Sequence, residues 1–480
     1  MPRNTSSRHR SKPSKGEAVQ IVSSTGKHTF SLNHRALMKI LLTKELKNVH
    51  VVLISVAGAF RGGKSFLLNF ILHYLITNEI ATSCSDTSDG FAWSVGSNRH
   101  TTGIWLWNKP IMYKLSNGQQ IAILLMDTQG VFDSKSIIKE CATIFALSTL
   151  LSSVQIYNLP GNIQDDDLQF LQVFTEYGRL ALKETNQTPF QTLHILVRDW
   201  SYPYEYAYGK DGGQKLLEDC MKVNRNLAEE KKQLRIHLQS CYEKITCFLL
   251  PHPGFKVATD PKFRGELSDI EPEFVNHVQE LLKYLIDEEN LTPKKVNGRL
   301  ITCRDLFHYF KVFMDIYADD QIPSPKTIFL ATAEANHISA VMTARDYYNK
   351  EIEKICGPTR SYVSPDALLK EHRRIVESAI QCYKKIPKIG EQELGHSYLN
   401  NLKDQLQKEL KMIMKRNEVK GRRLLTSFQP MTILFIIIFV IIAVQATGII
   451  RLLLHHIFSS ESLLIIIFVL LLVFVLKSSD

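Results

Sequence analysis

The sequence predicts an α/β domain with a mixed, mostly parallel sheet, followed by an α-helical (three-helix) bundle and a C-terminal transmembrane helical hairpin. Three observations carry this fold class. A glycine-rich loop near residue 60 joins an apolar strand to an apolar helix, and further apolar strands recur to about residue 250. From about residue 303 the glycine content falls and a helical periodicity takes over. Two uncharged apolar runs follow near the end of the printed sequence.

Composition excludes several classes of protein. The 480 residues are 45% hydrophobic and 22% charged, which is enough for two or three packed domains and excludes a disordered chain. The net charge is +10, but basic and acidic residues are interleaved, and no recognition motif accompanies them, so nucleic acid is not an expected partner. The eight cysteines show no C-x-x-C pair and no zinc-ligand spacing, which predicts reduced thiols.

The N-terminal stretch is polar and basic and lacks the apolar segment of a signal peptide. We expect residues 1–27 to form a disordered basic tail. Membrane insertion then has to depend on another part of the chain.

Residues 58–65, with the sequence GAFRGGKS, fit the pattern G-x-x-x-x-G-K-[ST] of a phosphate-binding loop. The preceding run 49–56 is typical of a strand buried on both faces, and 65–72 of the first turns of a buried helix. The alternative is a glycine-rich turn that matches by accident. The flanking strand and helix favour the phosphate-binding interpretation.

Within this loop each residue type has a chemical reason. Gly58 and Gly63 leave room for backbone N–H groups to surround phosphate oxygens at a helix N-terminus, whose dipole favours anions. Lys64 is expected to reach the β- and γ-phosphates. The Ser65 hydroxyl is expected to ligate Mg²⁺.

A second cluster of candidates follows. Thr101 precedes a predicted strand at 104–107 and is a candidate Mg²⁺ ligand, although a Thr-Thr pair alone does not establish this role. A hairpin of strands 111–115 and 121–126 leads to Asp127, which is placed to hold Mg²⁺ through water. Gly130 would let the backbone approach the γ-phosphate. The alternative for this segment is an ordinary strand-ending turn.

Two features leave questions open. Val131 stands where Ras-type enzymes have the glutamine that orients water, so another group must organise the attack. Further strands are predicted at 193–197 and 245–250, and ligands bind at the carboxyl ends of such strands, so Asp199 and the loop 251–257 are candidates for reading a base. No N-K-x-D motif is present, and spacing alone leaves the base undecided.

With these motifs in place, the chain resembles the atlastins, dynamin-superfamily GTPases of the endoplasmic reticulum related to guanylate-binding proteins. The similarity runs from about residue 28 to 415. The motifs that carry it are VAGAFR-x-GKS at 56–65, TTGI at 101–104, LLMDTQG at 124–130, VRDW at 197–200 and PHPG-x-KVAT at 251–259.

The resemblance implies the remaining site assignments. Arg61 would be an arginine finger supplied in cis, Thr101 the switch I ligand of Mg²⁺, and Arg198 with Asp199 the guanine readers. The expected catalytic residues are Arg61, Lys64, Ser65 and Thr101. The expected nucleotide-binding residues are Gly58, Arg61, Gly62, Gly63, Lys64, Ser65, Phe66, Asp127, Gly130, Arg198, Asp199 and Val257. The expected metal ligands are Ser65, Thr101 and, through water, Asp127.

The activity that the resemblance implies is Mg²⁺-dependent GTP hydrolysis by a homodimer, formed in trans and in cis, that tethers and fuses endoplasmic reticulum membranes. One alternative is a membrane-shaping protein in which nucleotide controls only oligomerisation. Another is a guanylate-binding-protein-like defence GTPase, which the apolar runs disfavour. Atlastins commonly carry an arginine that takes part in dimer contacts where this chain has Ser94, so the strength of the dimer stays open.

The nucleotide domain is predicted to span 28–300 and a helical middle domain 301–423. Apolar residues at helical spacing predict buried faces. They are Leu368, Ile375, Ala379 and Tyr383 on one helix and Leu399, Leu402, Leu406, Leu410 and Ile413 on the next. An intramolecular three-helix bundle is favoured over an exposed partner-binding face, and the resemblance makes the bundle a lever.

The C-terminal runs predict a membrane anchor. After a linker at 424–430, residues 431–450 would span about 30 Å as a helix, enough for a bilayer, whereas 463–476 would span about 21 Å. Basic residues flank the outer ends: Lys415, Arg416, Lys420, Arg422, Arg423 and Lys477. We therefore expect a multi-pass hairpin at 431–476 in the endoplasmic reticulum membrane, with both termini cytosolic. A buried core hairpin is the disfavoured alternative.

After the hairpin comes a short cytosolic tail at 477–480. Atlastins usually continue with an amphipathic tail helix, and none follows Lys477 here. The resemblance is therefore to a form lacking that tail, and we expect nucleotide-dependent tethering with fusion that needs a high protein density or strained membranes.

Overall fold

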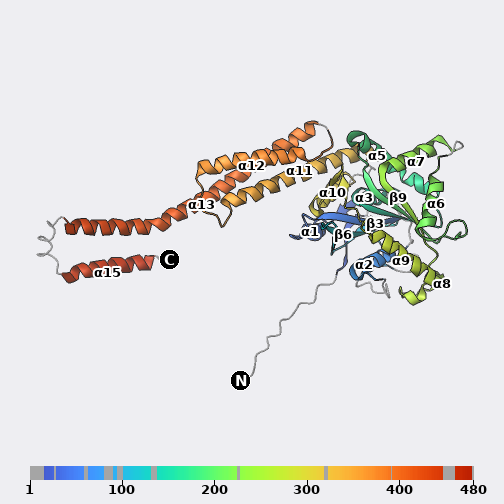
Figure 1. The fold of residues 1–480 in the computed structure, drawn as a ribbon, viewed down its shortest axis with the longest axis horizontal. Helices are drawn as coiled ribbons and strands as arrows, with labels where there is room; N and C mark the ends of the chain where they lie inside the picture. The colour runs from blue at the N-terminus through green and yellow to red at the C-terminus, as the bar shows by residue number, and fades with distance from the viewer. Residues whose placement is uncertain are drawn as a thin grey trace, which may run out of the picture. The chain divides into compact units, whose positions relative to one another are not determined.

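The computed structural model describes residues 16–25, 29–58, 63–79, 90–93, 101–130, 138–223, 227–317, 323–390, 392–446 and 460–477. The chain divides into two compact units, residues 1–340 with 386–396 and residues 341–385 with 397–480. Two of the three boundaries fall inside long helices, α11 (Pro325–Cys356) and α13 (Gln392–Ala446), and the third follows residue 385 (Figure 1). The first unit thus continues past residue 300.

In the first unit, nine strands of the described residues form one sheet in the order β2-β1-β4-β6-β3-β7-β8-β9, with β5 also paired to β6. The strands are β1 (Ala18–Ser24), β2 (Phe30–Leu32), β3 (His50–Gly58), β4 (Ile104–Trp107), β5 (Ile111–Lys114), β6 (Gln120–Thr128), β7 (Val154–Pro160), β8 (Phe190–Arg198) and β9 (Tyr242–Leu249). The run from β6 to β9 is parallel throughout, and the remaining pairs are antiparallel. The predicted mixed, mostly parallel sheet is confirmed.

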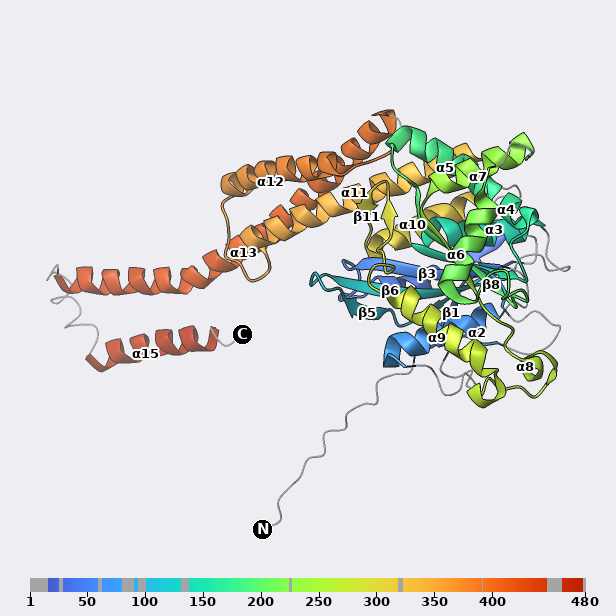
Figure 2. The same ribbon diagram turned by 45° about the vertical axis from the view of Figure 1, so that its right-hand side comes forward.

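The central strands are apolar on both faces because helices cover the sheet on both sides. Residues 51–54 of β3 are fully buried, which confirms the strand predicted there. The helices are α1 (His34–Leu41), α2 (Lys64–Thr77), α3 (Ile138–Leu151), α4 (Asp165–Phe170), α5 (Gln172–Thr185), α6 (Gly209–Met221), α7 (Glu229–Cys241), α8 (Phe255–Thr259), α9 (Pro272–Ile286) and α10 (Cys303–Ile316). Figure 2 shows α2 and α9 on one face and α3 and α10 on the other, each pair packed in its own apolar core.

Strand β1 corrects the N-terminal prediction. Residues 18–24, expected in a disordered tail, pair with both β2 and β4. Ile21 and Val22 are fully buried, and this burial of apolar side chains outweighs the polar character of the neighbouring sequence. Residues 1–15 lie outside the described part.

At the other end of the first unit, a short hairpin of β10 (Lys295–Val296) and β11 (Arg299–Leu300) leads into α10. Thr302 caps α10 by accepting a hydrogen bond from the N–H of Asp305, whose carboxylate accepts in return from the N–H of Thr302. This capping box fixes the point where the helical part of the chain begins.

The second unit contains the C-terminal part of α11, α12 (Pro365–Lys385), most of α13 and α15 (Ser460–Lys477). Tyr348 of α11 shares a hydrogen bond with His372 of α12, and Arg345 pairs with Glu409 of α13. The predicted apolar faces are confirmed, since every position named for them is buried except the half-buried Leu399.

No helix in the described ranges has both the length and the apolar composition that a membrane span requires. The hairpin predicted at 431–476 therefore stays a prediction.

Candidate functional site

The phosphate-loop motif lies at the carboxyl end of β3, where that strand gives way to α2. Gly58 has φ 145°, and a Cβ there would lie 2.1 Å from the carbonyl oxygen of Asn158 on β7. Gly63 has φ 69° and precedes Lys64, the first residue of α2. Both positions therefore require glycine.

Lys64 is buried at the start of α2. Only 7% of its surface is exposed. Burial lowers its pKa to about 8, while the carboxylate of Asp127 opposes the shift. A buried ammonium group is stabilised when an anion lies next to it, and phosphate oxygens would supply that negative charge.

Three oxygen-bearing side chains from three separate segments converge beside Lys64. The Ser65 hydroxyl donates a 2.6 Å hydrogen bond to Oδ2 of Asp127, and the Thr101 hydroxyl lies 3.3 Å from both. The second carboxylate oxygen of Asp127, Oδ1, is buried and has no hydrogen-bond partner among the described residues. Burial raises the pKa of Asp127, although the hydroxyls and Lys64 oppose this.

Hydroxyl and carboxylate oxygens are the ligands that Mg²⁺ prefers, and a buried carboxylate oxygen without a partner is costly unless a ligand satisfies it. The donor set of Ser65, Thr101 and Asp127 therefore fits the predicted metal. A cation there would favour the ionised carboxylate and would replace the hydrogen bonds that the hydroxyls now donate to it.

The base-reading candidates follow β8. Asp199 adopts φ 60°, a left-handed backbone, and its Oδ1 is buried with no partner among the described residues. Arg198 is buried with its guanidinium over the ring of Phe274 at 5.4 Å, and its Nη1 lies 3.0 Å from where a Cβ on Gly63 would be. Burial lowers the pKa of Arg198, against the effect of Asp199. This arginine therefore lies between the phosphate loop and the aspartate.

The other predicted nucleotide-binding residues are placed as follows. Val257 is half-buried on α8, and Gly130 is buried just after β6. Phe66 packs edge-on against Phe70 and Trp93, so its side chain belongs to the core under the loop. Arg61, Gly62, Ser94 and Val131 lie outside the described residues.

Two glutamines to which the sequence assigned no role bond the residues that follow Thr101, namely Thr102 and Gly103. Gln129 accepts a 2.9 Å hydrogen bond from the N–H of Gly103 through Oε1 and donates its own N–H to the Gly103 carbonyl. Gln20 of β1 donates from Nε2 to the carbonyl and hydroxyl oxygens of Thr102. Gln129 was visible inside the DTQG motif, whereas Gln20 gave no signal because its partner is 82 residues away.

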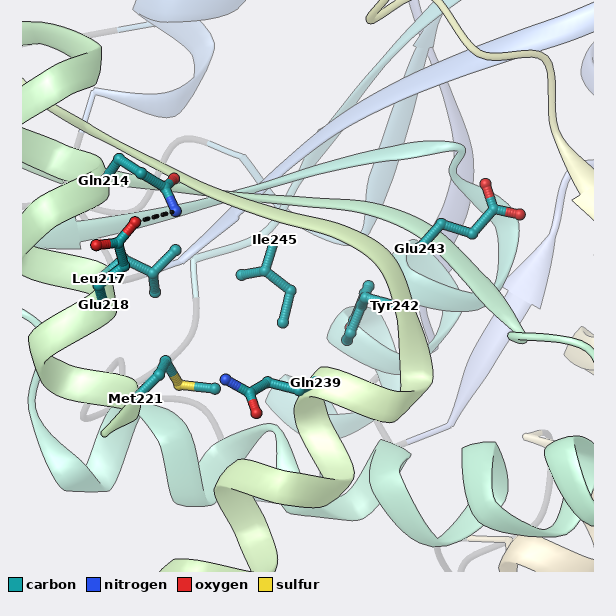
Figure 3. Close-up of a pocket in the computed structure, with 8 residues that line it drawn as sticks. All are labelled: Gln214, Leu217, Glu218, Met221, Gln239, Tyr242, Glu243 and Ile245. Atoms are coloured by element: carbon teal, nitrogen blue, oxygen red, sulfur yellow. Dashed lines mark hydrogen bonds between the residues drawn. The ribbon is translucent and has the colours of Figure 1, made fainter. Parts of the chain in front are cut away.

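A cavity of about 230 Å³ lies elsewhere in the first unit (Figure 3). It is lined by residues of α6, α7 and β9: Gln214, Leu217, Glu218, Met221, Gln239, Tyr242, Glu243 and Ile245. These include the first residues of β9, at the end opposite to the edge where Asp199 follows β8. The cavity therefore contains none of the predicted nucleotide-binding residues.

Comparison with known proteins identifies this arrangement. Residues 27–295 match the model of the guanylate-binding protein N-terminal domain. Atlastin-1 of Bos taurus is 44% identical over 442 residues, which cover 91% of this chain and 79% of that protein. Atlastin-2 of Homo sapiens is 44% identical over 88% of this chain and 73% of its own length. Atlastin of Drosophila melanogaster is 46% identical over 85% of this chain and 76% of its own length.

The chain belongs to the atlastin family. It is a dynamin-superfamily GTPase of the atlastin and guanylate-binding-protein type, as the resemblance in its motifs implies. The family match extends over both compact units, because the aligned share exceeds nine-tenths of this atlastin-type chain.

Proposed function

We propose that this atlastin-type GTPase is anchored in the endoplasmic reticulum membrane, dimerises in trans and in cis, and couples GTP hydrolysis to tethering and homotypic fusion. The observation that carries the proposal is the extent of the match: atlastin-1 aligns with 91% of the chain, a share that includes both the nucleotide domain and the helical part. The functional domains proposed are the GTPase domain at 28–300, to which strand β1 is now added, and the helical middle domain at 301–423.

In this proposal GTP binds at the carboxyl edge of the sheet. Lys64 binds the β- and γ-phosphates, and Ser65, Thr101 and Asp127 hold Mg²⁺, which when bound neutralises charge on the phosphate oxygens. Asp199 accepts hydrogen bonds from the guanine edge. The unpartnered Oδ1 atoms of the two aspartates support these roles, because each is a buried acceptor that a ligand would satisfy.

Arg61 would neutralise the charge that develops during phosphoryl transfer, in place of the water-orienting glutamine that Val131 replaces. The Arg198 guanidinium beside Gly63 is a different arginine with a different role. In this proposal it reads the guanine together with Asp199, and its burial against Phe274 and its Nη1 close to Gly63 support a fixed position for it.

The anchor would be the hairpin at 431–476, with both termini cytosolic because basic residues flank its outer ends. The middle domain would then act as the lever that transmits the conformational change of the GTPase domain to the membrane. The composition of the two apolar runs, nearly unbroken isoleucine, leucine, valine and phenylalanine, supports this anchor.

The test is reconstitution of the full chain into donor and acceptor vesicles. We expect lipid mixing that requires GTP and Mg²⁺ and that fails with GDP. Vesicle clustering and hydrolysis without lipid mixing, together with tubulation of single vesicles, would instead support the alternative in which the hairpin shapes membranes and nucleotide controls only oligomerisation.

A further inference from the structure

Lys420 differs from the other basic residues that precede the first apolar run. Its Nζ donates three hydrogen bonds to backbone carbonyls of the connection between α11 and α12: to Cys356 at 3.2 Å, Gly357 at 2.6 Å and Arg360 at 3.1 Å. These carbonyls include the C-terminal end of α11, where a cation is favourable. Lys420 is therefore part of a joint between α13 and the α11–α12 connection.

A second residue of α13 strengthens this joint. Asn417 is 4% exposed; its Oδ1 accepts from the N–H of Val363 at 3.1 Å and its Nδ2 donates to the Val363 carbonyl at 2.7 Å. One turn further, the ring of Tyr362 lies against Gly421, where a Cβ would come within 2.8 Å of it. The connection is thus held at both of its ends, and Figure 2 shows it passing beside α13.

The held connection exposes its own side chains. Arg360 is exposed, and Tyr362 is 40% exposed although one side of its ring contacts the helix. Lys415 and Arg416 are exposed on α13 close to Asn417. A positive charge and an amphipathic aromatic ring therefore occur together on the connection itself, on Arg360 and Tyr362.

The joint has a defined distance from the apolar run. The uncharged sequence begins at residue 424, three residues after Gly421, which is a rise of about 4.5 Å along a helix. The headgroup layer on each side of a bilayer is about 5–8 Å thick. Counted from residue 431, where the proposed hairpin begins, Gly421 is about 15 Å from the hydrocarbon core, which places it within about one Debye length of the outer edge of the headgroup layer.

We propose that the α11–α12 connection is a contact site for anionic phospholipid headgroups, which Lys420 and Asn417 hold in place against α13. This inference rests on the membrane anchoring proposed above. Arg360 attracts the anionic surface from within about one Debye length of it. Tyr362 contributes a hydroxyl that can hydrogen-bond a headgroup oxygen. The helix that enters the membrane is thereby braced on one side by the rest of its bundle.

The experiment measures hydrogen exchange of backbone amides 359–362 in the full chain, reconstituted in vesicles of phosphatidylcholine alone or mixed with phosphatidylserine. Exchange should be slower in the anionic vesicles, by at most about fivefold, because one arginine at such a surface contributes about 1 kcal/mol of binding free energy. Arg360→Glu should abolish the difference between the two vesicle types. Equal exchange in both vesicle types for the wild type would overturn the proposal.

The joint is tested with a charge-matched pair of variants. Lys420→Met and Lys415→Met each remove one positive charge from the same helix, but only Lys420 bonds the connection. We expect Lys420→Met to raise exchange at Val363 and to lose the effect of anionic lipid, whereas Lys415→Met keeps both near wild type. Identical behaviour of the two variants would refute the bracing role.

Flotation of the same vesicles separates this inference from the anchoring on which it rests. A chain that fails to float with vesicles contradicts the anchor itself. A chain that floats but shows no dependence of exchange on anionic lipid contradicts only the headgroup contact.

Discussion

A buried lysine lies near each end of strand β3, and the two lysines have different surroundings. At its carboxyl end, Lys64 lies beside Asp127, whose Oδ1 has no partner among the described residues. At its amino end, the Nζ of Lys294 donates a 2.8 Å hydrogen bond to the carbonyl of Ser152, and its N–H donates to the carbonyl of Val51. Burial lowers both pKa values, to about 8 for Lys64 and about 7 for Lys294.

A lowered lysine pKa therefore does not by itself identify a binding site. The neighbours make the distinction. Beside Lys64, a buried carboxylate oxygen is left for a ligand to satisfy, whereas Lys294 is tied to backbone atoms of the fold. If the two ends of β3 differ in function as they differ in surroundings, substitutions at the two ends should affect GTP turnover differently.

The largest effects are expected at the carboxyl end. Arg61→Ala should lower the rate of GTP hydrolysis ~10³- to 10⁵-fold with little change in GTP affinity, because the finger acts on charge that develops during transfer. Lys64→Ala should weaken GTP binding about 10- to 100-fold, because it removes a charged hydrogen bond present in both states. Nucleotide binding and single-turnover hydrolysis measure the two quantities. Equal loss of affinity in both variants would contradict the finger role.

Next is base selection. Asp199→Asn should weaken GTP binding about 10- to 100-fold, because an amide cannot accept two hydrogen bonds from the guanine edge. ATP binding should change little, so competition between the two nucleotides measures the effect. Equal affinity of the wild type for ATP and GTP would remove Asp199 from the base-reading role.

A smaller effect is expected from the glutamine in β1. Gln20→Ala removes two hydrogen bonds to Thr102, each worth about 0.5–1.5 kcal/mol, and should slow hydrolysis about fivefold by loosening the adjacent Thr101. Gln120→Ala at the far end of β6 is the control, since that glutamine is exposed and remote from the site. A loss of activity in both variants would indicate a general destabilisation of the sheet.

These residues also show which parts of the fold the sequence predicts. Strands such as β3 and β8 were predictable because their runs are apolar on both faces, and the phosphate loop because its motif fixes local geometry. Strand β7 was not predicted, since it carries polar residues. Gln155 on this strand accepts hydrogen bonds from the hydroxyls of Ser55 and Ser148, and its bond with Ser55 joins residues 100 positions apart. Such hydrogen bonds between distant residues form only in the folded chain, so a local sequence pattern does not predict them.

The same reasoning applies to the site. Ser65 was predicted at the start of a helix and Asp127 at the end of a strand, and the structure brings them to hydrogen-bonding distance. The role of Gln20 was not predictable, because it depends on the pairing of β1 with β4. The basic sequence before β1 had led us to expect a disordered tail there. Local sequence motifs thus identify the residues that bind ligand, whereas the residues that hold them in place depend on long-range strand pairing.

The smallest effect on activity is expected at the amino end of β3, where Lys294→Met should leave GTP turnover near wild type but change the pH dependence of stability. The folded chain binds a proton at Lys294 with a pKa of about 7, against 10.5 for an ordinary lysine. Between these values the unfolded chain binds more protons than the folded chain. The free energy of unfolding therefore rises with pH in this window, by at most about 1.4 kcal/mol per pH unit.

Replacing Lys294 by methionine removes this contribution, so the free energy of unfolding should rise less steeply with pH than in the wild type. Lys64 adds a similar slope above pH 8, so the interval from 7 to 8 is the most specific to Lys294. Denaturant unfolding of the full chain in detergent at a series of pH values measures the slope. An unchanged slope would mean that Lys294 keeps its proton when folded, and a large loss of GTP turnover would mean that the amino end of β3 is functional as well.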